Sequence, residues 1–170
     1  YQWTAIPLAL HGTVLRKDGT VLDVAIGEEE SDPLFYVTDL LPHLAKDQMA
    51  KTMREGVRGE NLNVVVGSRP YNDEKVKEKV KLNILRLLNE KYGLIEADFL
   101  SAELTMVPAF KARDVGFDRS FIGAYAHDDK VCAYTSMRAA LKVTDPAVTS
   151  VTVFADKEEV GSEGNTGLDS

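Results

Sequence analysis

The sequence has only one cysteine, no long apolar run and no excess of positive charge, and each shortage excludes a class of protein. The single cysteine, Cys132, rules out an intrachain disulfide framework and predicts a reducing compartment. The apolar stretches are too short to cross a bilayer, and the first residues lack the basic and then apolar order of a signal peptide. We therefore expect a soluble, cytoplasmic protein without a membrane partner.

The charge balance is acidic, since 20 Lys and Arg stand against 27 Asp and Glu and leave a formal net charge of -7. Such a balance disfavours a polyanionic partner such as nucleic acid. With 44% hydrophobic and 28% charged residues, the 170 residues have enough apolar material for one domain or two small ones. The chain opens with Tyr1 and closes in glycine-rich sequence, which we interpret as an excised part of a longer protein.

The first two thirds of the chain are typical of a β-rich domain with helices. Two apolar runs, Leu8–Leu15 and Val21–Ile26, flank Asp18-Gly19 and predict a β-hairpin. Apolar residues at helical spacing predict a helix over 73–92 that stops at Gly93. Further short strands are expected at 34–37, 62–66 and 100–107, and a weak helix at 49–57.

The composition changes between Pro108 and Asp118, where we expect a domain boundary, with one domain at 1–112 and a second at 113–170. In the second domain, apolar positions from Val131 to Leu141 predict an amphipathic helix that packs Cys132 as a small core residue. The β-branched run Val148–Ala155 predicts a central parallel strand covered on both faces. The predicted fold class is α+β, with a β-rich domain followed by a helix and a strand of an α/β domain.

Two acidic pairs stand at the edges of these last elements. Glu158-Glu159 follows the predicted strand, and Asp128-Asp129 precedes the predicted helix. Open α/β sheets build their sites outside the carboxyl ends of strands, so a carboxylate-rich metal site is expected there. A pair of divalent cations requires a shared anionic ligand, a further ligand and a base for the attacking water. Asp128, Glu159 and Glu158 are the candidates for those three roles.

Each of these residues also has an ordinary explanation. An aspartate at the first helical turn accepts backbone N–H bonds and complements the helix dipole, and adjacent glutamates usually face water. The three histidines, His11, His43 and His127, show no ligand spacing, and a lone histidine is more often structural or exposed. The residues alone therefore leave the metal site as one of several interpretations.

One stretch, Asp156-Lys157-Glu158-Glu159-Val160-Gly161-Ser162, resembles the Asp-Asn-Glu-Glu-Val-Gly-Ser element of the aspartyl aminopeptidase family of dinuclear zinc peptidases. Pro42-His43-Leu44-Ala45 resembles the family's Pro-His-Leu-Ala element, and Asp128-Asp129 resembles its Asp-Asn before a helix. The stretch 107–118 is similar to the bacterial members in particular. The resemblance spans nearly the whole chain.

The resemblance implies a fragment of a zinc metalloaminopeptidase that hydrolyses N-terminal residues from peptides and assembles as a homodimer or larger homo-oligomer. It implies that Asp128 bridges two zinc ions, that Glu159 ligates one of them, and that Glu158 deprotonates the attacking water. It further implies that His43 belongs to an inserted dimerisation domain at 1–112 and stabilises the transition state in the partner subunit's active site. Asp129 replaces the family's Asn, so its role stays open.

The family's remaining ligands, two histidines and an acidic residue, belong to regions before and after those matched here. We therefore expect the isolated chain to lack aminopeptidase activity and to hold zinc weakly. A second interpretation is an assembly module without chemistry of its own. A third is an unrelated acidic domain that binds calcium or no ion, although the sequence has no calcium-loop spacing. Acidic and neutral N-terminal residues both stay open as the preferred substrate.

Overall fold

The computed structural model describes residues 4–169, so Tyr1 lies outside the described part. The chain divides into two compact units, Tyr1–Lys111 and Ala112–Ser170. Mixed helix and sheet, as the sequence predicts, is confirmed by the observed elements. In the described part of the chain, no helix is both long and apolar enough to cross a membrane.

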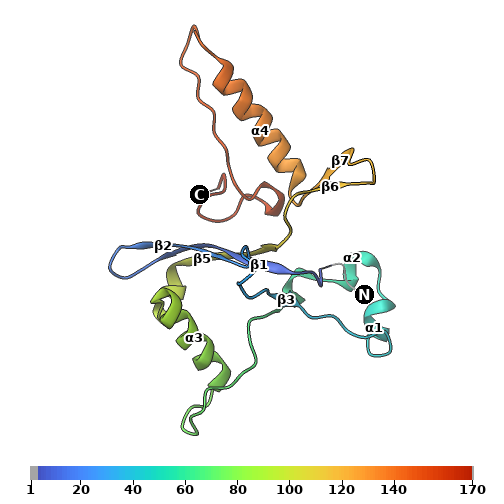
Figure 1. Cartoon of the computed structure of the whole chain (residues 1–170), viewed down its shortest axis with the longest axis vertical. Helices are drawn as coiled ribbons and strands as arrows, with labels where there is room; N and C mark the ends of the chain where they lie inside the picture. The colour runs from blue at the N-terminus through green and yellow to red at the C-terminus, as the bar shows by residue number, and fades with distance from the viewer. Residues whose placement is uncertain (1–3, 170) are drawn as a thin grey trace. The chain divides into compact units, whose positions relative to one another are not determined.

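A three-stranded antiparallel sheet forms the centre of the first unit (Figure 1). Its strand order is β2-β1-β5, and the strands run over Leu8–Leu15 (β1), Val21–Ile26 (β2) and Ala102–Pro108 (β5). The predicted hairpin of β1 and β2 is therefore confirmed at its predicted bounds. Its turn is held by Asp18, whose Oδ1 accepts hydrogen bonds from the backbone N–H and the hydroxyl of Thr20. These bonds lower the pKa of the Asp18 carboxyl below its usual value.

Gly12 is required where β1 passes β5. Its φ of +148° belongs to the region that favours glycine, and a Cβ at this position would lie 1.9 Å from the carbonyl oxygen of Glu103. Any side chain would therefore force β1 and β5 apart. The close approach lets β5 pair with β1 from Leu8 to Val14 without interruption.

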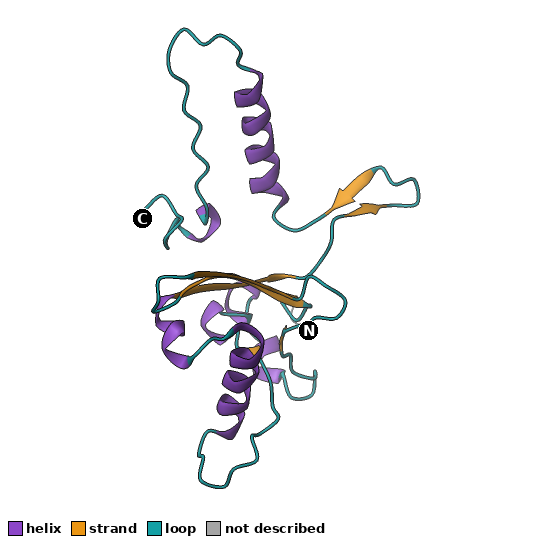
Figure 2. Cartoon of the chain, turned by 60° about the vertical axis from the view of Figure 1, so that its left-hand side comes forward, coloured by secondary structure: helices purple, strands orange, loops and turns teal. Residues whose placement is uncertain are grey.

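The longest helix of this unit, α3 (Lys79–Tyr92), lies on one face of the sheet together with the shorter helical turns (Figure 2). The core beneath it contains buried Val14, Val24, Ile26 and Leu94. The helix ends at Gly93, whose φ of 69° is left-handed and whose N–H donates to the carbonyl oxygen of Asn89. The predicted end of the helix is therefore confirmed.

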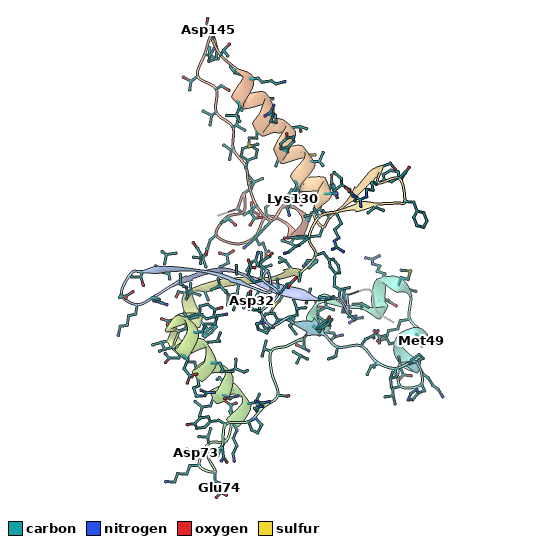
Figure 3. The ribbon with its side chains drawn as sticks, viewed as in Figure 1. Asp32, Met49, Asp73, Glu74, Lys130 and Asp145 are labelled. Atoms are coloured by element: carbon teal, nitrogen blue, oxygen red, sulfur yellow. The ribbon has the colours of Figure 1, made fainter. Side chains whose placement is uncertain are left out.

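The helix begins later than the predicted residue 73. Oδ1 of Asp73 accepts a hydrogen bond of 2.9 Å from the backbone N–H of Lys75, which offers this segment an alternative to helical bonding. Asp73 and Glu74 consequently lie in the loop that precedes α3 (Figure 3).

Short elements make up the rest of the first unit. The predicted strands at 34–37 and 62–66 are present as the shorter antiparallel pair β3 (Tyr36–Val37) and β4 (Val64–Val65). The weak helix expected at 49–57 is instead two single turns, because Thr52 is extended between them with ψ 157°. The helical turns are α1 (Lys46–Met49), α2 (Met53–Gly56), η1 (Gly59–Asn61) and η2 (Glu96–Ser101).

The second unit contains one long helix and one hairpin. The helix is α4 (His127–Lys142), at the position that the sequence predicts. The hairpin pairs β6 (Arg113–Val115) with β7 (Phe121–Gly123) and was not expected, because its strands are only three residues long. A further turn, η3 (Glu158–Val160), follows near the end of the unit.

The predicted central strand at Val148–Ala155 is wrong in this structure. The segment forms no strand, and the side chains of Val151 and Val153 are 78% and 77% exposed. A strand requires neighbours that pair with its N–H and C=O groups, and among the described residues β6 and β7 pair only with each other. The predicted fold class therefore holds for the helix of this domain but not for its strand.

The interpretation of Cys132 as a core residue is also wrong, because Cys132 is exposed. The apolar side of α4 shares this exposure: Tyr134 and Leu141 are 57% and 73% exposed. The periodicity correctly predicts the helix, but its apolar side stays largely exposed in the described unit.

Candidate metal centre

The beginning of α4 is fixed by two contacts with the hairpin and its exit. Nε2 of His127 lies 3.0 Å from the carbonyl oxygen of Ile122 in β7, to which the ring donates. The ammonium of Lys130 lies 4.1 Å from the centroid of the Tyr125 ring, a cation–π contact (Figure 3). Asp128 and Asp129 lie in the first turn of the helix, between these two contacts.

The chain returns from the far end of α4 to its beginning (Figure 3). Asp145 lies in the turn beyond the helix, and the extended segment after it leads to η3. Lys157 and Gly161 flank η3 in left-handed conformations, with φ of 64° and 90°. Gly161 thus provides a sharp turn after η3, and the two glutamates of η3 project from this turn.

Three carboxylates meet where the returning segment passes the beginning of α4. One side-chain oxygen from each of Asp129, Glu158 and Glu159 lies within 4.8 Å of the others, and all three residues are exposed. Of the predicted site residues, Glu158 and Glu159 are therefore brought together with the first turn of α4. Asp128 is not a member of this group; its neighbour Asp129 is.

Sequence spacing does not distinguish the two aspartates. Successive residues of a helix point about 100° apart, so either Asp128 or Asp129 is able to face the returning segment. The choice depends on the rotation of α4, and that rotation is set by contacts such as the bond from His127 to Ile122. No local pattern in the sequence reports these contacts.

The remaining predicted site residue, His43, belongs to the first unit. It is exposed and lies in the turn between Leu41 and α1. This turn is closed by the backbone N–H groups of Leu44 and Ala45, which both donate to the carbonyl oxygen of Leu41. His43 is thus carried on an ordered turn with its side chain accessible.

The three-carboxylate group fits a divalent cation. Carboxylate oxygens bind zinc at about 2.0 to 2.2 Å, so two such oxygens around a tetrahedral ion stand about 3.4 Å apart. The three oxygens lie within 4.8 Å of one another, so binding of one ion by all three requires them to close by at most about 1.4 Å. Oxygen donors suit zinc, magnesium, manganese and calcium alike. The geometry supports a metal centre without choosing the metal.

Comparisons with known proteins identify the metal class of the family. The sequence profile of the family described as aminopeptidase I zinc metalloprotease (M18) matches residues 1–170. The probable M18 family aminopeptidase 1 of Clostridium acetobutylicum is 51% identical over 170 residues, which are 100% of this chain and 37% of that protein. The corresponding protein of Thermotoga maritima is 50% identical over 167 residues, which are 98% of this chain and 36% of that protein.

Solved structures of M18 aminopeptidases share the fold of this chain. The crystal structure of aminopeptidase I from Clostridium acetobutylicum has a TM-score of 0.82 and 52% identity, and the match covers 98% of this chain and 37% of that one. The M18 family aminopeptidase of Thermotoga maritima has a TM-score of 0.78 and 44% identity, over 97% of this chain and 36% of that one. The chain thus spans little more than a third of the length of these relatives.

Proposed function

Because this chain belongs to the M18 family of aminopeptidase I zinc metalloproteases, we propose that it is part of a longer enzyme that removes N-terminal residues from peptides. The observation that supports this most directly is the meeting of Glu158 and Glu159 with the first turn of α4. These are the elements at which the family resemblance expects the reaction to occur.

Asp128 and Glu159 are the proposed metal ligands, with Asp128 shared between two zinc ions. When bound, zinc polarises the peptide carbonyl and lowers the pKa of a coordinated water. Glu158 is the general base: a carboxylate oxygen of its side chain takes the proton from the attacking water. Glu158 suits this role because it adjoins Glu159 on the same turn, and one of its carboxylate oxygens lies within 4.8 Å of one from Glu159.

Asp128 is preferred over Asp129 as the ligand for a chemical reason. Asp129 stands where the family element has Asn, and an amide carries no negative charge to offer a cation. A position that accepts Asn therefore does not require an anionic ligand. In the present structure the Asp129 carboxylate adds to the negative charge beside Glu158 and Glu159, and the proposed role of Asp129 is limited to this electrostatic contribution.

The second unit is proposed to be part of the catalytic α/β domain. Its exposed apolar surface supports this, because Val151, Val153 and Leu141 are 78%, 77% and 73% exposed and isolated domains rarely leave such side chains open together. The remainder of the longer protein is the expected cover. The 170 residues alone are therefore proposed to be inactive and to hold zinc weakly.

The first unit is proposed to be the inserted dimerisation domain. The segment around His43 carries several large apolar side chains that are at least half exposed: Leu40, Leu41, Leu44, Met49 and Met53. Exposed apolar surface of this kind is typical of protein–protein contacts. An assembly role for this unit is compatible with the catalytic proposal, since His43 would then reach the partner subunit's site.

The proposed function is tested by assaying the complete protein and the 170-residue chain side by side on aminoacyl substrates. We expect the complete protein to release N-terminal residues, to stop when a chelator removes its metal and to recover when zinc is returned. The 170-residue chain should show no turnover under any of these conditions. Turnover by the short chain after metal addition would overturn its proposed incompleteness, and chelator-resistant turnover by the complete protein would overturn the metal mechanism.

The proposed role of His43 predicts complementation between two inactive variants. Replacing His43 by Ala in the complete protein should lower kcat about 100-fold, the effect of removing one transition-state donor, with zinc content unchanged. Co-expression of His43→Ala with Glu158→Gln should restore activity, because a mixed dimer contains one site with both residues intact. The His11→Ala variant serves as the control and should stay active. Failure of the mixed dimer to regain activity would place His43 outside the partner's site.

A further inference from the structure

Two hydrogen bonds join Asp156 and Thr166, the residues on either side of the turn that carries the two glutamates. The hydroxyl of Thr166 donates to Oδ2 of Asp156 at 3.0 Å. In the opposite direction, the backbone N–H of Asp156 donates to the carbonyl oxygen of Thr166 at 3.1 Å. The two residues are ten positions apart, so this pair closes the chain between them into a loop.

The loop is held in a conformation that its residues do not favour by themselves. Lys157 and Ser162 carry side chains but have left-handed φ values of 64° and 62°. The backbone N–H of Ser162 donates to the carbonyl oxygen of Lys157 at 2.8 Å and tightens the turn around η3. Such a conformation persists only when surrounding contacts impose it.

The C-terminal end of the loop is also closely packed. Gly167 is buried, and a Cβ at this position would lie 1.8 Å from the carbonyl oxygen of Ser162. Because it has no side chain, Gly167 passes directly against Ser162 at the end of the turn. This close passage brings Thr166 within reach of Asp156.

Asp156 is acidic and close in sequence to the glutamates, but it does not belong to the three-carboxylate group. Its Oδ2 is occupied by the hydroxyl of Thr166. A hydrogen bond to an ionised carboxylate is among the stronger ones, because the charge assists it. The carboxylate of Asp156 therefore acts on the loop itself.

We propose that Asp156 and Thr166 are positioning residues that hold the loop so that Glu158 and Glu159 face the first turn of α4. The proposal rests on the proposed function, because it assigns the pair to the zinc site of that function. Glu158 and Glu159 repel each other and Asp129, and repulsion favours an opened loop. The hydrogen-bonded pair of Asp156 and Thr166 opposes this opening at the two ends of the loop, so the two glutamates are already in position when zinc binds.

The experiment compares three variants of the complete protein: Thr166→Val removes the hydroxyl at constant shape, Thr166→Ser retains it, and Thr152→Val is the control on the exposed extended segment. Zinc is titrated into each metal-free protein by calorimetry. We expect Thr166→Val to bind zinc about tenfold more weakly, as when a residue that orients a ligand is lost. Thr166→Ser and Thr152→Val should bind zinc as the unaltered protein does.

A second measurement separates positioning from direct metal contact. Amide hydrogen exchange of the metal-free proteins should be faster over residues 157–162 in Thr166→Val and unchanged in the other two variants. Weakened zinc binding without faster exchange would show that Thr166 acts on the ion directly, and would overturn the positioning role.

The Glu159→Gln variant distinguishes failure of the positioning role from failure of the proposed function. If Glu159→Gln loses zinc while Thr166→Val binds it normally, the positioning role is wrong and the proposed function stands. If the unaltered protein takes up no zinc, the proposed function fails and the positioning role fails with it.

Discussion

Replacing Glu158 by Gln in the complete protein should lower kcat for peptide hydrolysis by a factor of about 100 to 10,000, the usual contribution of a general base. Gln has nearly the shape of Glu, but its amide does not accept a proton from water at neutral pH. Zinc content should stay close to that of the unaltered protein, because the metal is assigned to Asp128 and Glu159. Steady-state kinetics and metal analysis on the same sample measure both quantities.

Glu163→Gln is the matched control for this substitution. Glu163 is an exposed glutamate five positions after Glu158 in the same loop, and it is not a member of the three-carboxylate group. It should retain full activity. A Glu158→Gln protein that lost its zinc would make Glu158 a ligand, and one that kept its turnover would remove it from the mechanism altogether.

The second large effect separates the two aspartates of α4. Asp128→Asn should reduce the zinc affinity of the complete protein more than 100-fold and abolish turnover, because it removes the charge of the proposed bridging ligand. Asp129→Asn should retain zinc and activity, since it restores the residue found in the family element and reduces the repulsion among Asp129, Glu158 and Glu159. Zinc titration of both proteins, with activity measured in parallel, provides the comparison.

The opposite result, in which Asp129→Asn has the larger effect on zinc binding, is the one that the observed group of Asp129, Glu158 and Glu159 would favour. If Asp129→Asn loses zinc and Asp128→Asn keeps it, the ligand is the residue that now lies within 4.8 Å of the glutamates. The assignment of Asp128 from the family element would then be wrong, while the metal centre itself would stand.

Local sequence signals account well for the first unit. Asp18-Gly19 between two apolar runs is sufficient to specify the hairpin of β1 and β2, because the turn is stabilised by bonds between neighbouring residues. Gly93 specifies the end of α3 in the same way. Both features depend on residues within a few positions of each other, so the sequence displays them directly.

In the second unit, local sequence signals do not predict every element correctly. The run Val148–Ala155 has the composition of a buried strand, but a strand depends on neighbours that composition does not supply. Exposure of Cys132 has the same origin, since α4 has the predicted periodicity but its apolar side stays exposed in the described unit. Composition indicates which secondary structure a segment favours, and tertiary contacts decide whether that structure forms.

The candidate site lies between these two cases. The family element predicts Glu158 and Glu159, and the structure places them together at the beginning of α4. Membership of Asp129, and the pairing of Asp156 with Thr166, depend on how two segments meet in space. Residues that are far apart along the chain give no periodic pattern, so only coordinates bring these contacts to light.

The most direct measurement is the location of zinc in crystals of the complete protein, determined from anomalous diffraction at the zinc edge. Our account predicts zinc with carboxylate oxygens of Asp128 and Glu159 at about 2.0 to 2.2 Å, and Glu158 beside the coordinated water. Zinc bound elsewhere, with the beginning of α4 and η3 ordered and apart, would contradict it.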